Sequence, residues 1–291
     1  MLLYYIYQLM NNNNISFQST GSTQIYLNSA NADIFLNQSK KSNVVFFFTN
    51  VLKIDKKSVE MKLSVVNAQI PVSWYLINDT NNRIYFSVNG VQNNYLFPNG
   101  NYNVNTFIST WISTFGNNWT LTFSKITNKI TFSNSLGPIV FGNNISASNT
   151  LFSLIGFDST KSYSSSVITG QLVSSYAINF LGLSKINIKS TTFPFKNFDS
   201  LTATATSTLC SIPVSSNASG IINYNNLTDY KSIFKEYEFN SIDISITDDK
   251  NNYIDFNNID WSMTLQIDIT NEIVENLDNL QDIYFNQHQE F

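Results

Sequence analysis

The sequence predicts a mainly β protein: a β-sandwich interrupted by a small α+β insertion. Two observations lead to this fold class. Short β-branched and aromatic runs, separated by Asn, Ser and Lys, occur in both flanks of the chain, and this spacing is typical of an all-β sandwich. Between the flanks the pattern changes to helical periodicity and hairpin turns. Because both flanks are needed to close a sandwich, we interpret the middle as an insertion into one β domain.

The first flank contains four expected strands. They cover residues 24–27, 32–36, 43–48 and 59–66. In the fourth, apolar and polar residues alternate: Val59, Met61, Leu63 and Val65 on one side, Glu60, Lys62 and Ser64 on the other. This alternation predicts a strand with one buried and one solvated face.

The expected insertion begins with a hairpin and a helix. Asn89-Gly90 separates two strand-like runs, and this pair accepts the positive φ values of a type I′ turn. A helix is expected next, because apolar residues follow at i, i+3, i+4, i+7, i+8 and i+11: Val104, Phe107, Ile108, Trp111, Ile112 and Phe115. Asn103 is the expected N-cap and Gly116 the expected stop.

A second hairpin and a short helix complete the expected insertion. Alternation over residues 119–124, a turn near Asn128 and a return through Ile130 and Phe132 indicate the hairpin. A helix-like segment then runs from Asn149 to Gly156. The middle of the chain is therefore expected to be strand, strand, helix, strand, strand, helix.

Strands return in the second flank. They are expected at residues 176–180, 185–189, 209–214, 241–246 and 261–269, the last with unbroken alternation beginning at Trp261. The predicted organisation is an N-terminal arm at 1–20, with Met10 as an alternative start. The first part of the sandwich follows at 21–77, the insertion at 78–170, the second part at 171–271 and an acidic C-terminal tail at 272–291.

Composition favours a building block over a catalyst. Twenty acidic and sixteen basic residues stand beside a 43% apolar fraction with 23 Phe and 15 Tyr, so Asn, Ser and Thr must cover much of the surface. Such a surface suits large lateral contacts. The net charge of −4 argues against direct nucleic-acid binding, which needs clustered Lys and Arg. The apolar start, residues 1–10, is too short for a membrane span, and none is expected.

Few residues offer chemistry. The only His, His288, lies close to the C-terminus, and the only Cys, Cys210, lies in a strand-like run where we expect a small buried hydrophobe. Residues 248–255 are rich in acidic and amide oxygens but lack the central Gly and the final Glu of an EF-hand loop, so a polar hairpin is predicted there. The sequence predicts no catalytic, cofactor-binding or metal-binding residue, no cofactor and no enzyme. A single Cys fits a reducing compartment.

Several stretches, taken in order, resemble the penton proteins, single jelly-roll minor capsid proteins of virophages and Polinton-like viruses. The resemblance covers about residues 20–285. The stretches that carry it are VEMKLSVVNAQIPVSWYLIN at 59–78, PNGNYNVNTFISTW at 98–111, LIGF at 154–157, IPVSSNASGIINYNN at 212–226 and IDISITDDKNNYIDFNNIDWSMTLQIDI at 242–269. These are patterns of fold and turn, not a chemical signature. The first ten residues have no counterpart in the resemblance.

The resemblance implies a jelly roll of two four-stranded sheets and an insertion domain that faces outward. It also implies a homopentamer at each vertex of an icosahedral virion, contacts with surrounding major capsid protein capsomers, and assembly in the host cytoplasm. The alternative is a carbohydrate- or receptor-binding β-sandwich module of a viral fibre or surface protein. That module requires exposed Trp or Tyr in a concave site, whereas a capsid protein places its aromatic residues in cores and subunit interfaces.

Overall fold

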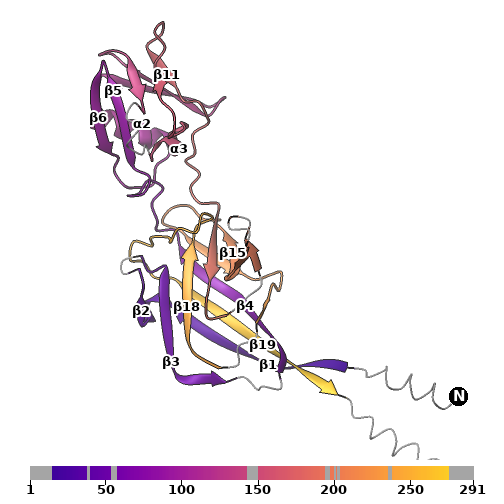
Figure 1. Cartoon of the computed structure of the whole chain (residues 1–291). Helices are drawn as coiled ribbons and strands as arrows, with labels where there is room; N and C mark the ends of the chain where they lie inside the picture. The colour runs from indigo at the N-terminus through magenta and orange to yellow at the C-terminus, as the bar shows by residue number, and fades with distance from the viewer. Residues whose placement is uncertain are drawn as a thin grey trace, which may run out of the picture. The chain divides into compact units, whose positions relative to one another are not determined.

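The structure, a computed structural model, describes residues 15–37, 40–53, 58–142, 150–193, 197–199, 201, 204–234 and 238–274. The chain forms two compact units (Figure 1). One unit, here called the β domain, contains the chain up to Val72 and from Lys185 onward. The other, here called the lobe, is Ser73–Ser184.

The described residues of the β domain form two large antiparallel sheets and one separate pair of short strands. The first has the order β1 (Ile15–Asn28), β19 (Ser262–Val274), β4 (Ser58–Pro71) and β16 (Ile221–Asn225), with β17 (Ser232–Phe234) also paired to β4. The second has the order β15 (Thr208–Pro213), β12 (Lys185–Lys189), β18 (Glu238–Thr247), β3 (Asn43–Lys53) and β2 (Ile34–Phe35). A 3-10 turn, η1 (Ser29–Asn31), follows β1, and β13 (Asn197–Asp199) pairs with β14 (Thr204–Thr206).

The strand order is that of a jelly roll. The main strands of the β domain, leaving aside the short strands β2, β13, β14 and β17, are β1, β3, β4, β12, β15, β16, β18 and β19. If these strands are numbered from one to eight along the chain, the order in one sheet is first, eighth, third, sixth, and the order in the other is second, seventh, fourth, fifth. Two interlocked Greek keys produce this order. The predicted fold class, a mainly β single jelly-roll sandwich, is confirmed, and the lobe follows β4 and precedes β12 in the chain.

The core of the β domain follows from the period-2 pattern. Met61, Leu63 and Val65 of β4 are each at most 2% exposed, as their alternation with polar residues predicts. Trp261 directly precedes β19 and lies edge-on to Phe46 of the other sheet, with 6.3 Å between ring centroids. The inward faces of the two sheets therefore meet around these side chains.

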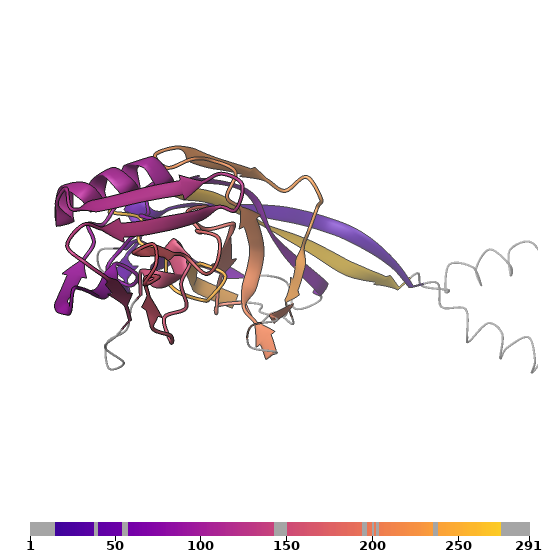
Figure 2. The same cartoon turned by 90° about the horizontal axis from the view of Figure 1, so that it is seen from above.

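The chain ends differ from the sequence expectation. β1 begins at Ile15 and pairs with β19 as far as Val274, so residues 15–20 and 272–274 lie in a strand pair and not in an arm and a tail. Figures 1 and 2 show β1 and β19 side by side. The sequence did not predict this pairing because residues 18–24 are mostly polar and show no apolar alternation. The hydrogen bonds between paired strands are made by the backbone and do not require apolar side chains. The rest of the expected arm and tail, including His288, lies outside the described residues.

Two further expectations were wrong for residues 171–180, where the second part of the sandwich was expected to begin. Residues 176–180 form no strand; Ile178 N donates to Asn128 O and Asn179 N donates to Leu154 O. The preceding strand β11 (Gln171–Val173) pairs with β8 of the lobe and not with the sandwich. A short apolar run predicts a strand but does not identify its partner sheet, because that depends on contacts distant in sequence.

In its described residues, the lobe combines two small sheets with two helices. One sheet has the order β10 (Tyr163–Ser164), β9 (Ile139–Phe141), β5 (Arg83–Val88) and β6 (Val91–Leu96). The other has the order β11, β8 (Lys129–Asn134) and β7 (Trp119–Ser124). The helices are α2 (Val104–Phe115) and α3 (Phe152–Ile155). The two expected hairpins are confirmed, whereas β9, β10 and β11 are only two or three residues long and gave no periodic signal.

Local sequence explains the principal lobe elements. Asn89 and Gly90 have φ values of +48° and +80°, as the predicted type I′ turn requires. The Asn103 side chain accepts hydrogen bonds from the backbone N of Asn105 and Thr106, so it caps α2 as predicted. The helix ends at Gly116. The N-cap of α3 is Leu151, which makes no side-chain cap hydrogen bond. Asn149, the expected start of this segment, lies outside the described residues.

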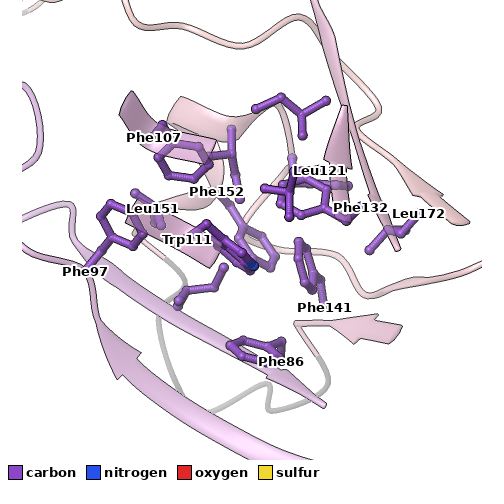
Figure 3. Close-up of a cluster of buried hydrophobic side chains, with 14 of the residues drawn as sticks. Phe86, Phe97, Phe107, Trp111, Leu121, Phe132, Phe141, Leu151, Phe152 and Leu172 are labelled. Atoms are coloured by element: carbon purple, nitrogen blue, oxygen red, sulfur yellow. The ribbon is translucent and has the colours of Figure 1, made fainter. Parts of the chain in front are cut away.

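The lobe has its own aromatic core. Trp111 of α2 is fully buried at its centre (Figure 3). Seven aromatic rings lie with centroids 4.7–6.3 Å from its ring: Phe86, Phe97, Phe107, Phe115, Trp119, Phe132 and Phe141. Edge and tilted packing of this kind adds stabilisation beyond area burial. Two residues of the predicted apolar stripe, Phe107 and Trp111, are thus fully buried in the core of the lobe.

Asp243 of β18 fixes the segment after β12. Its carboxylate accepts backbone N–H bonds from Thr191 and Thr192 at 2.7–2.9 Å, and side-chain bonds from both threonines and Ser190 at 2.7–3.1 Å. Burial raises the pKa of this carboxyl, but the hydrogen bonds outweigh burial and leave the pKa below the ordinary value of 3.8. The charged form is therefore the one that the folded domain stabilises.

This arrangement predicts acid-sensitive stability. Because the folded-state pKa of Asp243 lies below its unfolded value, its stabilisation is complete above about pH 4 and is lost as the pH falls through the folded pKa. Asp243→Asn is expected to lower the free energy of unfolding near pH 7 by about 1–3 kcal/mol, since the amide cannot accept all these bonds. Urea unfolding at pH 7 and pH 3 measures both effects. A variant whose stability loss is equal at the two pH values would contradict this role.

Candidate assembly surfaces

The β domain has open sides where its sheets end. Among the described strands, β1 and β16 end one sheet, while β15 and β2 end the other. Asn197 Nδ2 donates to Thr208 O of β15 at 2.8 Å and to Ser232 Oγ of β17 at 3.2 Å. β15 and β17 therefore meet on one side of the sandwich. Edge strands of this kind invite pairing or packing against another chain unless they are covered.

A first groove lies among β1, β3 and β19. It has a volume of about 480 Å³. Its lining consists of Tyr26, Leu27, Asn28, Asn31, Asp33, Phe46, Phe47, Phe48, Asn67, Ser262, Met263 and Thr264. Tyr26 is 75% exposed and Phe47 is 53% exposed. Asp33 is the only charged residue of this lining, and its carboxylate accepts a hydrogen bond from the Phe47 backbone N at 2.7 Å.

Tyr26 is held in place by a polar chain on the sheet. Its hydroxyl donates to Gln24 Oε1 at 2.7 Å, and Gln24 Nε2 donates to Gln266 Oε1 at 3.1 Å. An exposed aromatic ring with a fixed orientation loses little conformational entropy on binding. The first groove therefore presents an oriented, nearly uncharged aromatic surface.

A second groove is lined by residues of β12, β13, β14, β15 and β16. It has a volume of about 890 Å³. Its lining consists of Lys185, Asn187, Asn197, Phe198, Leu201, Thr206, Thr208, Leu209, Cys210, Ser211, Tyr224, Thr228, Tyr230 and Asp249. Phe198, on the β13–β14 hairpin, is 81% exposed, and Leu201 is 55% exposed. Lys185 and Asp249 are its only charged residues, so the second groove is also poor in charge.

Cys210, the only cysteine, is a buried strand residue. Cys210 lies in β15 and is 8% exposed, and desolvation by burial raises the pKa of its thiol to about 12. The thiol is protonated at neutral pH and is not an activated nucleophile. Among the described residues, no group of three or more His, Cys, Asp or Glu side chains could hold a metal ion.

Residues 248–255 form the predicted polar hairpin turn. The Asp248 carboxylate accepts hydrogen bonds from the backbone N of Lys250 and of Asn252, both at 2.8 Å. Thr247 and Tyr253 pair across the turn. The acidic side chain thus closes its own turn, as Asx motifs do.

The four tryptophans are buried. Trp74, Trp111, Trp119 and Trp261 are 8%, 0%, 5% and 1% exposed. The sequence predicted a core position for Trp111 and Trp261 and left the other two open. None of the four is available to stack on a sugar. The exposed aromatic residues of the grooves are Tyr26, Phe47, Phe198 and Tyr230.

Sequence reasoning did not identify these groove residues. One signal was available in the run Phe46-Phe47-Phe48, because successive strand residues point to opposite faces. Phe46 is buried and Phe47 is exposed. No comparable signal marked Phe198, since a three-residue strand carries no period.

No helix in the described part of the chain is long and apolar enough to cross a membrane. No protein-family model matches the chain, and no curated protein matches it. Among solved structures, the chain is similar to the crystal structure of selenomethionine-labelled mavirus penton protein. The two share 12% sequence identity with a TM-score of 0.48, over 86% of this chain and 100% of that chain.

Proposed function

We propose that this chain is a structural capsid protein whose β domain assembles head to tail into a closed homopentamer at the vertices of an icosahedral virion. The observation that carries the proposal is the presence, on one jelly roll, of two different grooves that are poor in charge and display exposed aromatic side chains. A head-to-tail ring requires two unlike patches on each subunit. The number five comes from the sequence resemblance to penton proteins.

The surface chemistry supports subunit contacts. A standard interface buries roughly 800 Å² per partner, and charges buried there cost free energy unless they are paired. The two grooves together contain only Asp33, Lys185 and Asp249 as charged lining residues. Exposed aromatic residues in such surroundings are typical of interface centres. In the virion, major capsid protein capsomers would surround the pentamer, with assembly in the host cytoplasm and without enzymatic activity.

Single-groove variants test the proposal. Tyr26→Asp in the first groove and Phe198→Asp in the second are each expected to abolish rings, because a buried unpaired charge is strongly unfavourable in an interface. Both side chains are exposed in the subunit, so its folding should change little. Ile126→Asp is the matched control, since Ile126 is 95% exposed but lies in the lobe. Native mass spectrometry measures all three.

Mixing the two groove variants distinguishes head-to-tail rings from symmetric contacts. Each variant keeps one intact groove, and the two intact grooves are complementary in a head-to-tail contact. A mixture is therefore expected to give a dimer that cannot grow. Monomers alone in the mixture, or rings from either variant alone, would contradict the assignment of the two grooves.

Glycan binding is the second candidate function. It is favoured by Tyr26 in the first groove beside Asn28, Asn31 and Asn67, an aromatic ring with amides in a concave site. If this function holds, Tyr26→Ala removes glycan binding on an array of immobilised sugars while leaving the oligomeric state unchanged. Under the capsid proposal the same variant weakens the pentamer.

A further inference from the structure

One end of the lobe is formed by three neighbouring turns, here called the turn cluster. They are the β5–β6 turn at 88–91, the β8–β9 turn at 134–138 and the β10–β11 turn at 165–170. Asn89 N donates to Pro138 O at 2.9 Å, and Ser165 N donates to Ile139 O at 2.8 Å. The three turns are therefore adjacent.

The turn cluster displays protruding aliphatic side chains. Val167 and Ile168 are 101% and 91% exposed, and Val91 and Leu136 are 67% and 60% exposed. These residues come from all three turns, so the apolar surface belongs to the end of the lobe and not to one loop. Exposed apolar side chains gathered at one end of a unit mark an interaction site more often than scattered single residues do.

No charged residue lies in the turn cluster. The lobe has only six in its whole sequence, Asp79, Arg83, Lys125, Lys129, Asp158 and Lys161, and all lie outside the three turns. Lys125 and Lys129 border the β7–β8 turn, at the opposite end of the hairpin from the β8–β9 turn. The turn cluster can therefore leave water without desolvating a charge, and it offers no cation to attract an anionic surface.

The backbone of the longest turn is already hydrogen-bonded. Ser166 Oγ accepts from the backbone N of Ile168 and Thr169, and Ser166 O accepts from Gly170 N. Ser166 N donates to Gln171 O at 2.8 Å. Entry of a loop into an apolar phase is costly mainly because of unpaired backbone groups. In this turn the backbone N–H groups of residues 166, 168, 169 and 170 are already paired, so moving them into an apolar phase does not leave them without a partner.

The turns are also held close together. A Cβ on Gly137, which has a φ of +142°, would approach Asn89 Cβ to 2.9 Å. Glycine therefore allows the β8–β9 turn to pack directly on the β5–β6 turn. The two turns are therefore in close contact, and their exposed aliphatic side chains can enter a fluid apolar phase without a shaped pocket.

We propose that the turn cluster is a docking site for an electrically neutral phospholipid surface, into which Val91, Leu136, Val167 and Ile168 insert shallowly. Neutral headgroups match the absence of charge, and aliphatic side chains gain free energy by leaving water for the acyl-chain boundary. This site is separate from the grooves of the β domain and does not depend on the proposed pentamer.

Vesicle flotation of the full chain tests the site. With phosphatidylcholine vesicles, the wild-type protein is expected to float, and Val167→Ser with Ile168→Ser is expected to lower the partition coefficient about tenfold or more. Ile126→Ser is the matched control: it removes an equally exposed aliphatic side chain beside Lys125, and its partitioning should equal that of wild type. Adding phosphatidylserine or raising the salt concentration should change wild-type binding little.

A fluorescent probe tests insertion directly. Since the four native tryptophans are buried, Val167→Trp is expected to shift its emission to the blue on adding phosphatidylcholine vesicles and to be quenched by bromine-labelled acyl chains. Ile126→Trp should show neither change. Absence of wild-type flotation together with unshifted emission of the Val167→Trp variant would overturn the proposal. So would flotation that persists in the double Ser variant, binding that requires anionic lipid, or capture of a protein partner by the turn cluster without vesicle binding.

Discussion

Trp261→Ala is expected to lower the free energy of unfolding of the β domain by about 3–5 kcal/mol. Trp261 is 1% exposed and packs edge-on against Phe46 of the opposite sheet. Its Nε1 donates to Lys41 O at 2.7 Å, and its backbone N donates to Ser29 Oγ at 3.1 Å. The substitution removes the ring, opens a cavity between the sheets and leaves the Lys41 carbonyl without this donor.

Urea unfolding of Trp261→Ala and Trp261→Phe measures the two contributions. Phe keeps most of the apolar volume but cannot donate to Lys41 O, so Trp261→Phe should be destabilised by less than Trp261→Ala. Tyr26→Ala is the matched surface control, because Tyr26 is 75% exposed. A stability of Trp261→Ala close to that of wild type would place this side chain outside the core.

Trp111→Ala is expected to destabilise the lobe by a similar amount, about 3–5 kcal/mol. Trp111 has no exposed surface and contacts rings from α2, both sheets of the lobe and Phe97. Unlike Trp261 Nε1, Trp111 Nε1 is buried without a hydrogen-bond partner in the described structure. Trp111→Phe therefore loses volume but also removes an unsatisfied donor, and it should cost less than Trp261→Phe.

The same variant tests the prediction that the insertion is an independent lobe. If the lobe folds on its own, Trp111→Ala lowers the midpoint of its transition and leaves that of the β domain unchanged. Limited proteolysis along the unfolding curve can assign each transition to its unit. A single transition that moves as a whole would contradict independent folding.

The sequence predicted those turns, helices and strands that are determined by residues close together in the chain. Asn89-Gly90 and the capped stripe from Val104 to Phe115 are complete within a few residues, so their turn and helix could be predicted. The alternation of β4 likewise placed its buried face. The jelly-roll order could not be read in this way, because neighbours such as β1 and β19 lie some 240 residues apart in the chain, and only the resemblance implied it.

The grooves were beyond sequence reasoning for a related reason. Exposure of Tyr26 and Phe198 depends on which strands end each sheet, and edge position is a property of the whole topology. The turn cluster is similar: Val91, Leu136 and Val167 belong to separate turns that only the fold brings together. By contrast, the buried state of Cys210 could be predicted, because an apolar run around a small thiol is a local pattern.

The native mass of the purified full chain, with class averages from electron microscopy of the protein and of virions, tests the central claim most directly. The capsid proposal predicts a closed species of five times 33.0 kDa, seen as five-fold rings and located at virion vertices. A protein that stays monomeric at every concentration and is absent from the vertices would contradict it.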